Sequence, residues 1–274
     1  MKVIILAAGR GSRLSPLTDN KPKCMVKLFG KSLLKWQIEK FREVGIKDIS
    51  VVTGYKKELI IMDGIKIYHN ENFEKTNMIE TLFCAKKEIN EKVIVSYGDI
   101  IFQNSVVEKL IESKEDFSVV IDKEWRKYWS IRFDNPLDDA ESLILDSENY
   151  IKNIGQKTTN LDEIQGQYIG LMMFKGKSTE IIKKFYDKMK KLSKINENPL
   201  NSNLTFQLSY MTDFLQGLVN EKYKLKAILI ENGWLELDSM YDYEIYNKLY
   251  EEGNISNFIN INNNERDLKK YDEV

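Results

Sequence analysis

The chain has few of the residues on which several common catalytic sites depend. Its 274 residues include one histidine, His69, and two cysteines, Cys24 and Cys84. With a single histidine, placed at the end of an expected strand, we predict neither a catalytic triad nor a multi-histidine zinc site. We expect both cysteines to be small buried apolar residues without a disulfide, as is typical of a reduced cytosolic protein.

Long apolar runs and an excess of charge of either sign are missing as well. No stretch approaches the roughly 18 apolar residues that a membrane-spanning helix needs. We also expect no signal peptide, because Met1 and Lys2 lead directly into the first expected strand. The 41 basic and 42 acidic residues leave a net charge of −1, which argues against nucleic-acid or membrane affinity. We therefore expect a cytoplasmic protein with no membrane insertion and no nucleic-acid partner.

The most informative segment is residues 1–25, MKVIILAAGRGSRLSPLTDNKPKCM. Its apolar residues 3–6 predict a buried strand, and the loop that follows has almost no side-chain bulk until Arg13. Gly9 and Gly11 let the backbone approach a ligand closely and point N–H groups at it. Arg13 and Lys23 place two positive charges near this loop. Together these features suit a nucleoside triphosphate.

The glycine spacing distinguishes this loop from two common phosphate-binding loops. A Rossmann loop needs a third glycine at position 14, where Leu14 stands, and a P-loop needs a Gly-Lys-Ser/Thr sequence that does not follow here. A Gly-x-Gly pair alone is often only a tight turn. The longer string G-x-G-S-R-L-x-P-L-T followed by K-P-K resembles the signature of nucleotidyltransferases that act on sugar 1-phosphates, phosphocholine and related phosphates or phosphonates.

This resemblance implies roles for individual residues. In that family the loop holds the nucleotide, so Arg13 and Lys23 are expected to bind its phosphates rather than to be ordinary surface cations. The family's loop equivalent to Asn77 lies beside the nucleobase and the acceptor, although an asparagine at this place also suits a plain helix N-cap. The nucleotide-binding residues expected on this basis are Leu6, Ala7, Ala8, Gly9, Gly11, Ser12, Asn77 and Met78.

Strand and helix patterns alternate along the chain. We expect strands at 49–52, 65–68, 93–95, 117–121, 168–174 and 225–230. We expect helices between Ser32 and Gly45 and at 77–89, 106–111, 181–192 and 206–219. This rhythm predicts an α/β fold with a doubly wound, mainly parallel, Rossmann-like sheet, and the resemblance implies the nucleotide-diphospho-sugar transferase type. A single domain over 1–252, with a substrate-binding insertion at about 123–165 and a polar tail at 253–274, is the simplest organisation.

Two aspartates follow expected strands, Asp99 after Tyr97-Gly98 and Asp238 before a helix. Taken singly, each fits an ordinary turn or helix cap. The resemblance implies that they jointly hold Mg²⁺, an ion that prefers carboxylate, phosphate and water oxygens. Held there, Mg²⁺ would bridge the α-phosphate and the acceptor phosphate and neutralise their charge. The expected catalytic set is therefore Arg13, Lys23, Asp99 and Asp238, with Asp99 and Asp238 as the metal ligands.

The sequence of residues 119–174, together with the segment from Thr76 to Ala85, resembles the sequences of a cytidylyltransferase subgroup. That subgroup acts on phosphocholine, 2-aminoethylphosphonate or capsule-linked phosphoglutamine, the last being most similar, and the resemblance extends to about residue 246. Aromatic walls and carboxylates would suit an ammonium group, although each such residue also has an ordinary structural explanation. Arg132 could pair with a phosphate or carboxylate of the acceptor or, alternatively, with an internal aspartate. The acceptor-binding candidates are Trp125, Trp129, Arg132, Asp138, Asp139, Lys157, Glu163, Gln167 and Tyr168.

Lys157 aligns with a lysine that sugar-phosphate members of the family use on the acceptor phosphate. Their local pattern is usually Glu-Lys-Pro, whereas this chain has Gln-Lys-Thr, which weakens the case for a sugar acceptor. We predict a Mg²⁺-dependent cytidylyltransferase that joins CMP from CTP to a small amine-bearing phosphate or phosphonate, in surface-polymer or phosphonate assembly, with a homodimer as one option for its oligomeric state. The alternatives are a sugar-1-phosphate nucleotidyltransferase using UTP or dTTP, and a non-catalytic nucleotide-sensing subunit.

Overall fold

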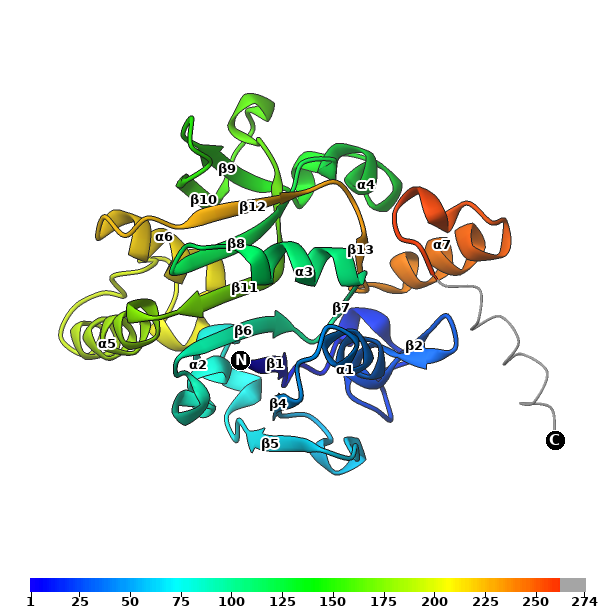
Figure 1. The fold of residues 1–274 in the computed structure, drawn as a ribbon, viewed down its shortest axis with the longest axis horizontal. Helices are drawn as coiled ribbons and strands as arrows, with labels where there is room; N and C mark the ends of the chain where they lie inside the picture. Colours follow the sequence, from blue (N-terminus) through cyan, green and yellow to red (C-terminus); the bar gives the residue numbers. More distant parts are fainter. Residues whose placement is uncertain (262–274) are drawn as a thin grey trace.

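A seven-stranded, mainly parallel sheet forms the centre of the computed structural model, which describes residues 1–261 (Figure 1). The middle strands β4, β1 and β6 are parallel, as are β4 with β5 and β8 with β12, while β11 runs antiparallel to both β6 and β8. The predicted α/β, doubly wound class is therefore confirmed. In spatial order the strands are β12 (Lys226–Ile230), β8 (Phe117–Asp122), β11 (Gln167–Lys175), β6 (Lys92–Tyr97), β1 (Lys2–Ala7), β4 (Asp48–Thr53) and β5 (Ile65–His69).

Helices cover both faces of this sheet, and β1 shows how the sequence allows it. Successive side chains of a strand point to opposite faces, so Val3 and Ile5 enter one core cluster while Ile4 and Leu6 enter the other. The first cluster includes residues of α1 (Leu33–Glu43), α3 (Asn104–Glu112), α4 (Trp125–Arg132) and α7 (Met240–Glu251). The second includes residues of α2 (Met78–Cys84), α5 (Lys177–Leu192) and α6 (Met211–Asn220).

The segment predicted as an insertion, 123–165, divides between two places. Its helix α4 packs beside α7, where the hydroxyls of Tyr128 and Tyr246 lie 2.6 Å apart. Its strands β9 (Glu141–Leu145) and β10 (Ile151–Lys157) form a separate antiparallel pair, and the backbone N–H of Ile154 donates to the Gln216 side chain on α6. Figure 1 shows the pair β9–β10 at the edge of the molecule beyond β12, with α4 reaching toward α7.

Short elements place the two predicted metal ligands near each other. Strand β7 (Ile100–Phe102) follows β6 after one turn and pairs antiparallel with β13 (Trp234–Glu236). The N–H of Leu237 then donates to the carbonyl oxygen of Asp99 at 2.9 Å. Two further short strands, β2 (Lys27–Leu28) and β3 (Lys31–Ser32), form a hairpin. The 3₁₀ turns are Ser12–Leu14, Lys23–Met25, Lys57–Leu59, Phe73–Lys75, Lys86–Glu88, Pro136–Asp138, Leu161–Glu163, Phe206–Leu208 and Ile255–Asn257.

The structure differs from the expected elements in several details. The helix expected over 77–89 ends at Cys84 and continues as a 3₁₀ turn, and the helix expected over 206–219 begins at Met211, because Asp213 caps the N–H of Tyr210. Cys24 is buried as expected, but Cys84 is exposed, which corrects that expectation.

The polar tail also departs from its expected boundary. Ile255, Phe258 and Ile259 are at most 5% exposed and belong to the core around α7, so the packed chain extends past residue 252. The rest of the predicted tail, 262–274, lies outside the described residues. Among residues 1–261 there is no helix both long and apolar enough to cross a membrane.

Candidate functional site

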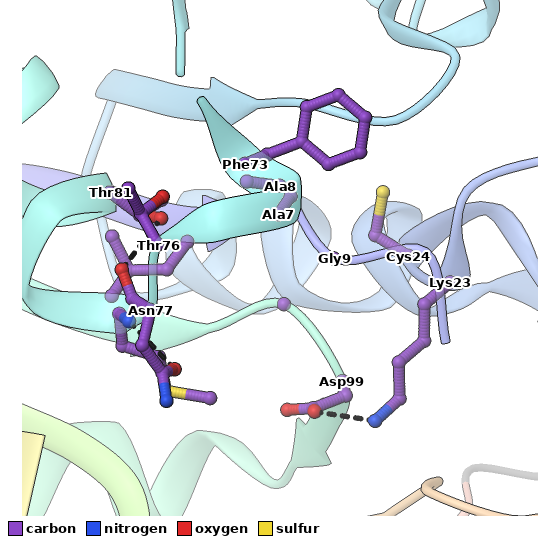
Figure 2. Close-up of a pocket in the computed structure, with 13 residues that line it drawn as sticks. Ala7, Ala8, Gly9, Lys23, Cys24, Phe73, Thr76, Asn77, Thr81 and Asp99 are labelled. Atoms are coloured by element: carbon purple, nitrogen blue, oxygen red, sulfur yellow. Dashed lines mark hydrogen bonds and ion pairs between the residues drawn. The ribbon is translucent and has the colours of Figure 1, made fainter. Parts of the chain in front are cut away.

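A cavity opens where β1 and β6 end, and we call it the glycine-loop cavity. Figure 2 shows its lining, with Thr76 and Asn77 on one side, Lys23 and Cys24 on the other and Asp99 between them. Ligands bind at the carboxyl ends of strands in open α/β sheets. Six of the eight predicted nucleotide-binding residues line this cavity: Leu6, Ala7, Ala8, Gly9, Asn77 and Met78. The sequence reasoning did not select its other lining residues Cys24, Phe73, Thr76, Thr81 and Gly98.

Two glycines are required by close packing beside this cavity. A Cβ on Gly98 would lie 2.7 Å from the carbonyl oxygen of Leu6, to which the Gly98 N–H donates. A Cβ on Gly11 would lie 2.8 Å from the Cβ of Lys23, and Gly11 also has a φ of +76°, which favours glycine. Gly11 and its neighbour Ser12, both predicted to bind the nucleotide, are not among the residues that line the cavity. Instead, Gly11 leaves the space through which the Lys23 side chain passes.

Lys23 joins the two predicted metal ligands. Its Nζ lies 2.7 Å from Asp99 Oδ2 and 2.7 Å from Asp238 Oδ1, and Figure 2 shows the first of these ion pairs. Arg13, whose side chain is 69% exposed, pairs with the other oxygen of Asp238 at 2.6 Å. The four residues predicted as the catalytic set thus form one cluster, although they come from distant parts of the chain.

Within this cluster, the ionised forms of Lys23 and Asp238 are favoured. Burial alone would lower the pKa of Lys23, but attraction to Asp99 and Asp238 outweighs it and raises the pKa above its ordinary value. Burial opposes ionisation of Asp238, yet Lys23 and Arg13 hold the pKa of this carboxyl below its usual range. In contrast, burial raises the pKa of the Cys24 thiol to about 12, so this cavity residue is not a thiolate nucleophile at neutral pH.

Asn77 occupies the helix start that the sequence suggested. Its Oδ1 accepts from the Met78 N–H at the beginning of α2, and its Nδ2 donates to the Leu208 carbonyl. Its own N–H donates to the carbonyl of Gln207. The N-cap explanation therefore holds, and it coexists with the place of Asn77 on the cavity wall.

A second cavity shares Met78 with the first, and we call it the acidic cavity. Four predicted acceptor residues line it: Trp129, Asp139, Gln167 and Tyr168. Its other lining residues are Met78, Tyr97, Glu141, Ile169, Gly170, Tyr210, Thr212, Trp234 and Glu236. The rings of Tyr97 and Tyr168 meet edge to face with centroids 5.6 Å apart, and Trp129 donates from Nε1 to Asp139. Aromatic walls and carboxylates are thus combined in one place.

Two glutamates of the acidic cavity were not selected from the sequence. Burial, reinforced by Asp139 and Asp213, raises the pKa of Glu141 to about 7. Burial also raises the pKa of Glu236 to about 7, with Arg132 opposing this rise. Gln167 fixes the first of them, because its side-chain amide bonds both the N–H and the carbonyl of Glu141. A cation that enters such a cavity favours the ionised form of the buried carboxyl, and the ionised carboxyl in turn stabilises the bound cation.

Three of the remaining acceptor candidates form an outer rim next to the acidic cavity. A third cavity continues from Asp139 and Glu141 outward and is lined by Asp138, Lys157 and Glu163. We call these three residues the rim. Lys157 is the rim's cation and is exposed, at the end of β10.

Two acceptor candidates lie elsewhere, which corrects the expectation for them. Trp125 is 1% exposed and packs in the core against Trp129, so it has no surface to offer a ligand. Arg132 has a guanidinium only 1% exposed, paired with Asp242 and Glu236. Its alternative explanation, an internal aspartate partner, is therefore the one observed.

Comparisons with known proteins show the family of the chain. The MobA-like NTP transferase domain model matches residues 3–149. A CTP:phosphoglutamine cytidylyltransferase of Campylobacter jejuni is 41% identical over 89% of this chain and 98% of its own length. The chain belongs to the nucleotidyltransferases with a MobA-like NTP transferase domain. The predicted family is thereby confirmed.

One further relative and two solved structures are also similar to this nucleotidyltransferase. A choline-phosphate cytidylyltransferase of Streptococcus pneumoniae is 37% identical over 38% of the chain and 47% of its own length. The solved structure of a CTP:phosphocholine cytidylyltransferase from S. pneumoniae has a TM-score of 0.69 at 23% identity, covering 91% of this chain and 98% of that one. An inositol-1-phosphate CTP transferase from T. maritima reaches 0.68 at 19% identity, covering 95% and 98%. At these identities the two structures support the fold.

Proposed function

We propose that this nucleotidyltransferase uses CTP and joins CMP to a small amine-bearing phosphate or phosphonate, releasing pyrophosphate. One observation carries the proposal: the cluster of Asp99, Asp238, Lys23 and Arg13 borders a cavity of small residues, whose wall includes Asp99 and Lys23, and an acidic, aromatic cavity shares Met78 with that first one. The first suits a nucleotide and the second suits a cation. The cytidylyltransferase of C. jejuni, 41% identical over nearly its whole length, supports the choice of CTP.

The reaction needs no general base. A phosphate or phosphonate oxygen of the acceptor is already an anion at pH 7, so it attacks the α-phosphorus of CTP directly. The new P–O bond forms as the bond to the β-phosphate oxygen breaks, and pyrophosphate leaves with the electron pair. Lys23 and Arg13 neutralise charge on the triphosphate, and the two cavities align the reactants. The scarcity of histidine in the chain is therefore no obstacle.

Mg²⁺ fits the carboxylates that are present. Asp99 Oδ1 is buried and has no hydrogen-bond partner within residues 1–261, and the same stretch has no cluster of three or more His, Cys, Asp or Glu residues suited to a metal. Two carboxylates suit Mg²⁺, which commonly binds through one or two of them plus phosphate and water. Asp99 and Asp238 would hold the ion. When bound, it would supply charge neutralisation for the phosphates.

The acceptor's amine is assigned to the acidic cavity. Glu141, Glu236 and Asp139 provide negative charge, and the rings of Tyr97, Tyr168, Trp129, Trp234 and Tyr210 provide aromatic faces. Ammonium groups bind such surroundings by cation–π attraction and ion pairing. Phosphoglutamine, 2-aminoethylphosphonate and phosphocholine all have this combination of an anionic and a cationic end. The product would be a CMP-activated precursor for surface-polymer or phosphonate assembly.

The test is pyrophosphate release across a matrix of CTP, UTP, dTTP and ATP against phosphoglutamine, 2-aminoethylphosphonate, phosphocholine and glucose 1-phosphate. We expect turnover with CTP and an amine-bearing acceptor, lost when EDTA removes divalent ions. Turnover restricted to UTP or dTTP with glucose 1-phosphate would establish the sugar-phosphate alternative instead. Triphosphate binding without any turnover would establish the nucleotide-sensing alternative. A homodimer remains a prediction, which sedimentation of the purified chain would test.

A further inference from the structure

Arg132 lies outside both cavities and is nevertheless among the most completely bonded side chains near the site. Its Nε donates to Asp242 Oδ1 at 2.9 Å and its Nη2 to Asp242 Oδ2 at 3.3 Å. Its Nη1 donates to Glu236 Oε2 at 2.9 Å. A guanidinium fork that meets a carboxylate in this two-point way fixes orientation as well as charge.

Asp242 in turn holds the backbone at Asp238, one of the two proposed metal ligands. Its Oδ2 accepts from the backbone N–H of Asp238 at 3.0 Å and from that of Ser239 at 2.9 Å. One carboxylate therefore holds the turn that carries Asp238 and is itself held by Arg132. Asp242 is 2% exposed, and burying a carboxylate costs free energy unless a cation and hydrogen bonds compensate it, as Arg132 does here.

The same arginine is tied to the strand before this turn. Glu236 ends β13, and its carbonyl accepts from Tyr246 while its N–H donates to Tyr128. Arg132 holds the side chain of this residue. The backbone from 236 to 239 is thus fixed from both ends, and the hydrogen bond from the Leu237 N–H to the Asp99 carbonyl links it to the second metal ligand.

We propose that Arg132, acting through Asp242, is a positioning residue that sets the distance and orientation of Asp238 relative to Asp99 for divalent-ion binding. The proposal rests on the proposed metal role of these two aspartates. It assigns Arg132 no contact with the acceptor. Groups that orient metal ligands commonly change metal affinity about 10- to 100-fold when they are removed.

The experiment compares Arg132→Lys with the wild type by titrating Mn²⁺ into the full-length protein with CTP present, following free Mn²⁺ by electron paramagnetic resonance. Lysine keeps the positive charge but cannot make the two-point contact with Asp242. We expect the Mn²⁺ dissociation constant to rise about 10-fold or more. At saturating Mn²⁺, kcat should recover to within a few-fold and the KM for CTP should stay near the wild-type value, because the glycine-loop cavity is untouched.

Ser239→Ala is the matched control. It removes the hydrogen bond between the Ser239 hydroxyl and the Asp242 N–H at the start of α7, while Arg132, Asp242 and the Asp238 amide stay connected. We expect it to lower the melting temperature without moving Mn²⁺ affinity. If Arg132→Lys does not fold, Asp242→Asn, which is nearly isosteric, takes its place with the same expected shift.

Three results would overturn the proposal. These are a folded Arg132→Lys protein with Mn²⁺ affinity within twofold of the wild type, an equal shift in Ser239→Ala, or no Mn²⁺ binding by the wild type with CTP. Failure of the proposed function is separate, since it would appear as no pyrophosphate release by the wild type while the Mn²⁺ comparison still discriminates between the variants.

Discussion

The glycine-loop cavity is lined mainly by backbone and small side chains, whereas the acidic cavity next to it is lined by large aromatic and carboxylate side chains. The first draws six of its lining residues from one N-terminal strand and the segment after it, Leu6 to Gly9 together with Lys23 and Cys24. The second gathers its lining from β6, α4, β9, β11, α6 and β13. The same molecule therefore lines two neighbouring cavities in two different ways.

The difference has a physical reason. A surface made of backbone amides depends on close approach, which requires small residues at fixed spacing and so leaves a compact signature in the sequence. A surface made of side chains needs each one only at the right point in space. Those side chains can be far apart in the chain, and each has an ordinary structural use besides.

The largest effect is expected at Asp99, on the wall of the glycine-loop cavity. Asp99→Asn keeps the size of the side chain but removes its negative charge, so it should lower kcat for pyrophosphate release on the order of 1,000-fold, a loss comparable to that of a key electrostatic contact in other enzymes. Circular dichroism and the melting temperature should show a folded protein. Near-normal turnover would remove Asp99 from the proposed metal pair.

The glycine-loop cavity was also easier to predict from the sequence than the acidic cavity. The sequence of residues 1–25 was sufficient to predict the family and five of the residues that line the glycine-loop cavity, and the 3.6- and 2-residue periodicities were sufficient for the mainly parallel sheet. The meeting of Asp99 and Asp238 came from the family resemblance, because no local pattern connects positions 139 residues apart. The role of each residue stays a prediction until the variants are measured.

The acceptor side was harder for identifiable reasons. Trp125 and Trp129 lie one helical turn apart on α4, and only packing decides that Trp129 reaches a cavity while Trp125 stays in the core. Glu141 begins a strand in polar sequence and carries no signal of its own. Its environment, set by Gln167 on β11, exists only in the folded chain.

The next largest effect tests the acidic cavity alone. Glu141→Gln should raise the KM for the best amine-bearing acceptor about 10- to 100-fold at pH 8, because hydrogen bonds to charged groups contribute about 1.5–3 kcal/mol. The KM for CTP should not change. Steady-state kinetics with each substrate varied in turn gives both values, and Glu221→Gln, on the surface at the end of α6, is the control for the loss of one charge.

The pH profile sharpens this test. A carboxyl with a pKa of about 7 is ionised above pH 7 and protonated below it. Since an ammonium group binds the ionised form, acceptor KM for the wild type should rise by up to about tenfold per unit as pH falls below 7. Glu141→Gln should flatten this rise. A profile that is the same in both proteins would assign the amine to another carboxyl.

A smaller effect is expected from the backbone-built region. Gly11→Ala would have two effects. It would put a side chain on a residue with a φ of +76°, and its Cβ would lie 2.8 Å from the Cβ of Lys23. Gly30→Ala has a φ of +85° with no atom within 4 Å of its added Cβ, so it reproduces the backbone strain, about 1–3 kcal/mol, without touching Lys23. We expect both to lower the melting temperature, and Gly11→Ala alone to lower kcat/KM for CTP, by about tenfold. Equal kinetics would mean that Lys23 needs no room beside Gly11.

The smallest effect is expected at the rim. Its size shows whether the bound acceptor extends from the acidic cavity as far as the rim. Lys157→Met removes an exposed cation that lines the same cavity as Asp138 and Glu163, and Lys152→Met, on the same strand, is its control. Exposed ion pairs contribute about 0.2–1 kcal/mol, which corresponds to at most a fivefold change in acceptor KM. An acceptor of the phosphoglutamine type has a carboxylate near its amine and should show this rise, whereas phosphocholine has none and should not. The two acceptors measured side by side therefore show whether Lys157 binds the acceptor's carboxylate or only balances the acids around it.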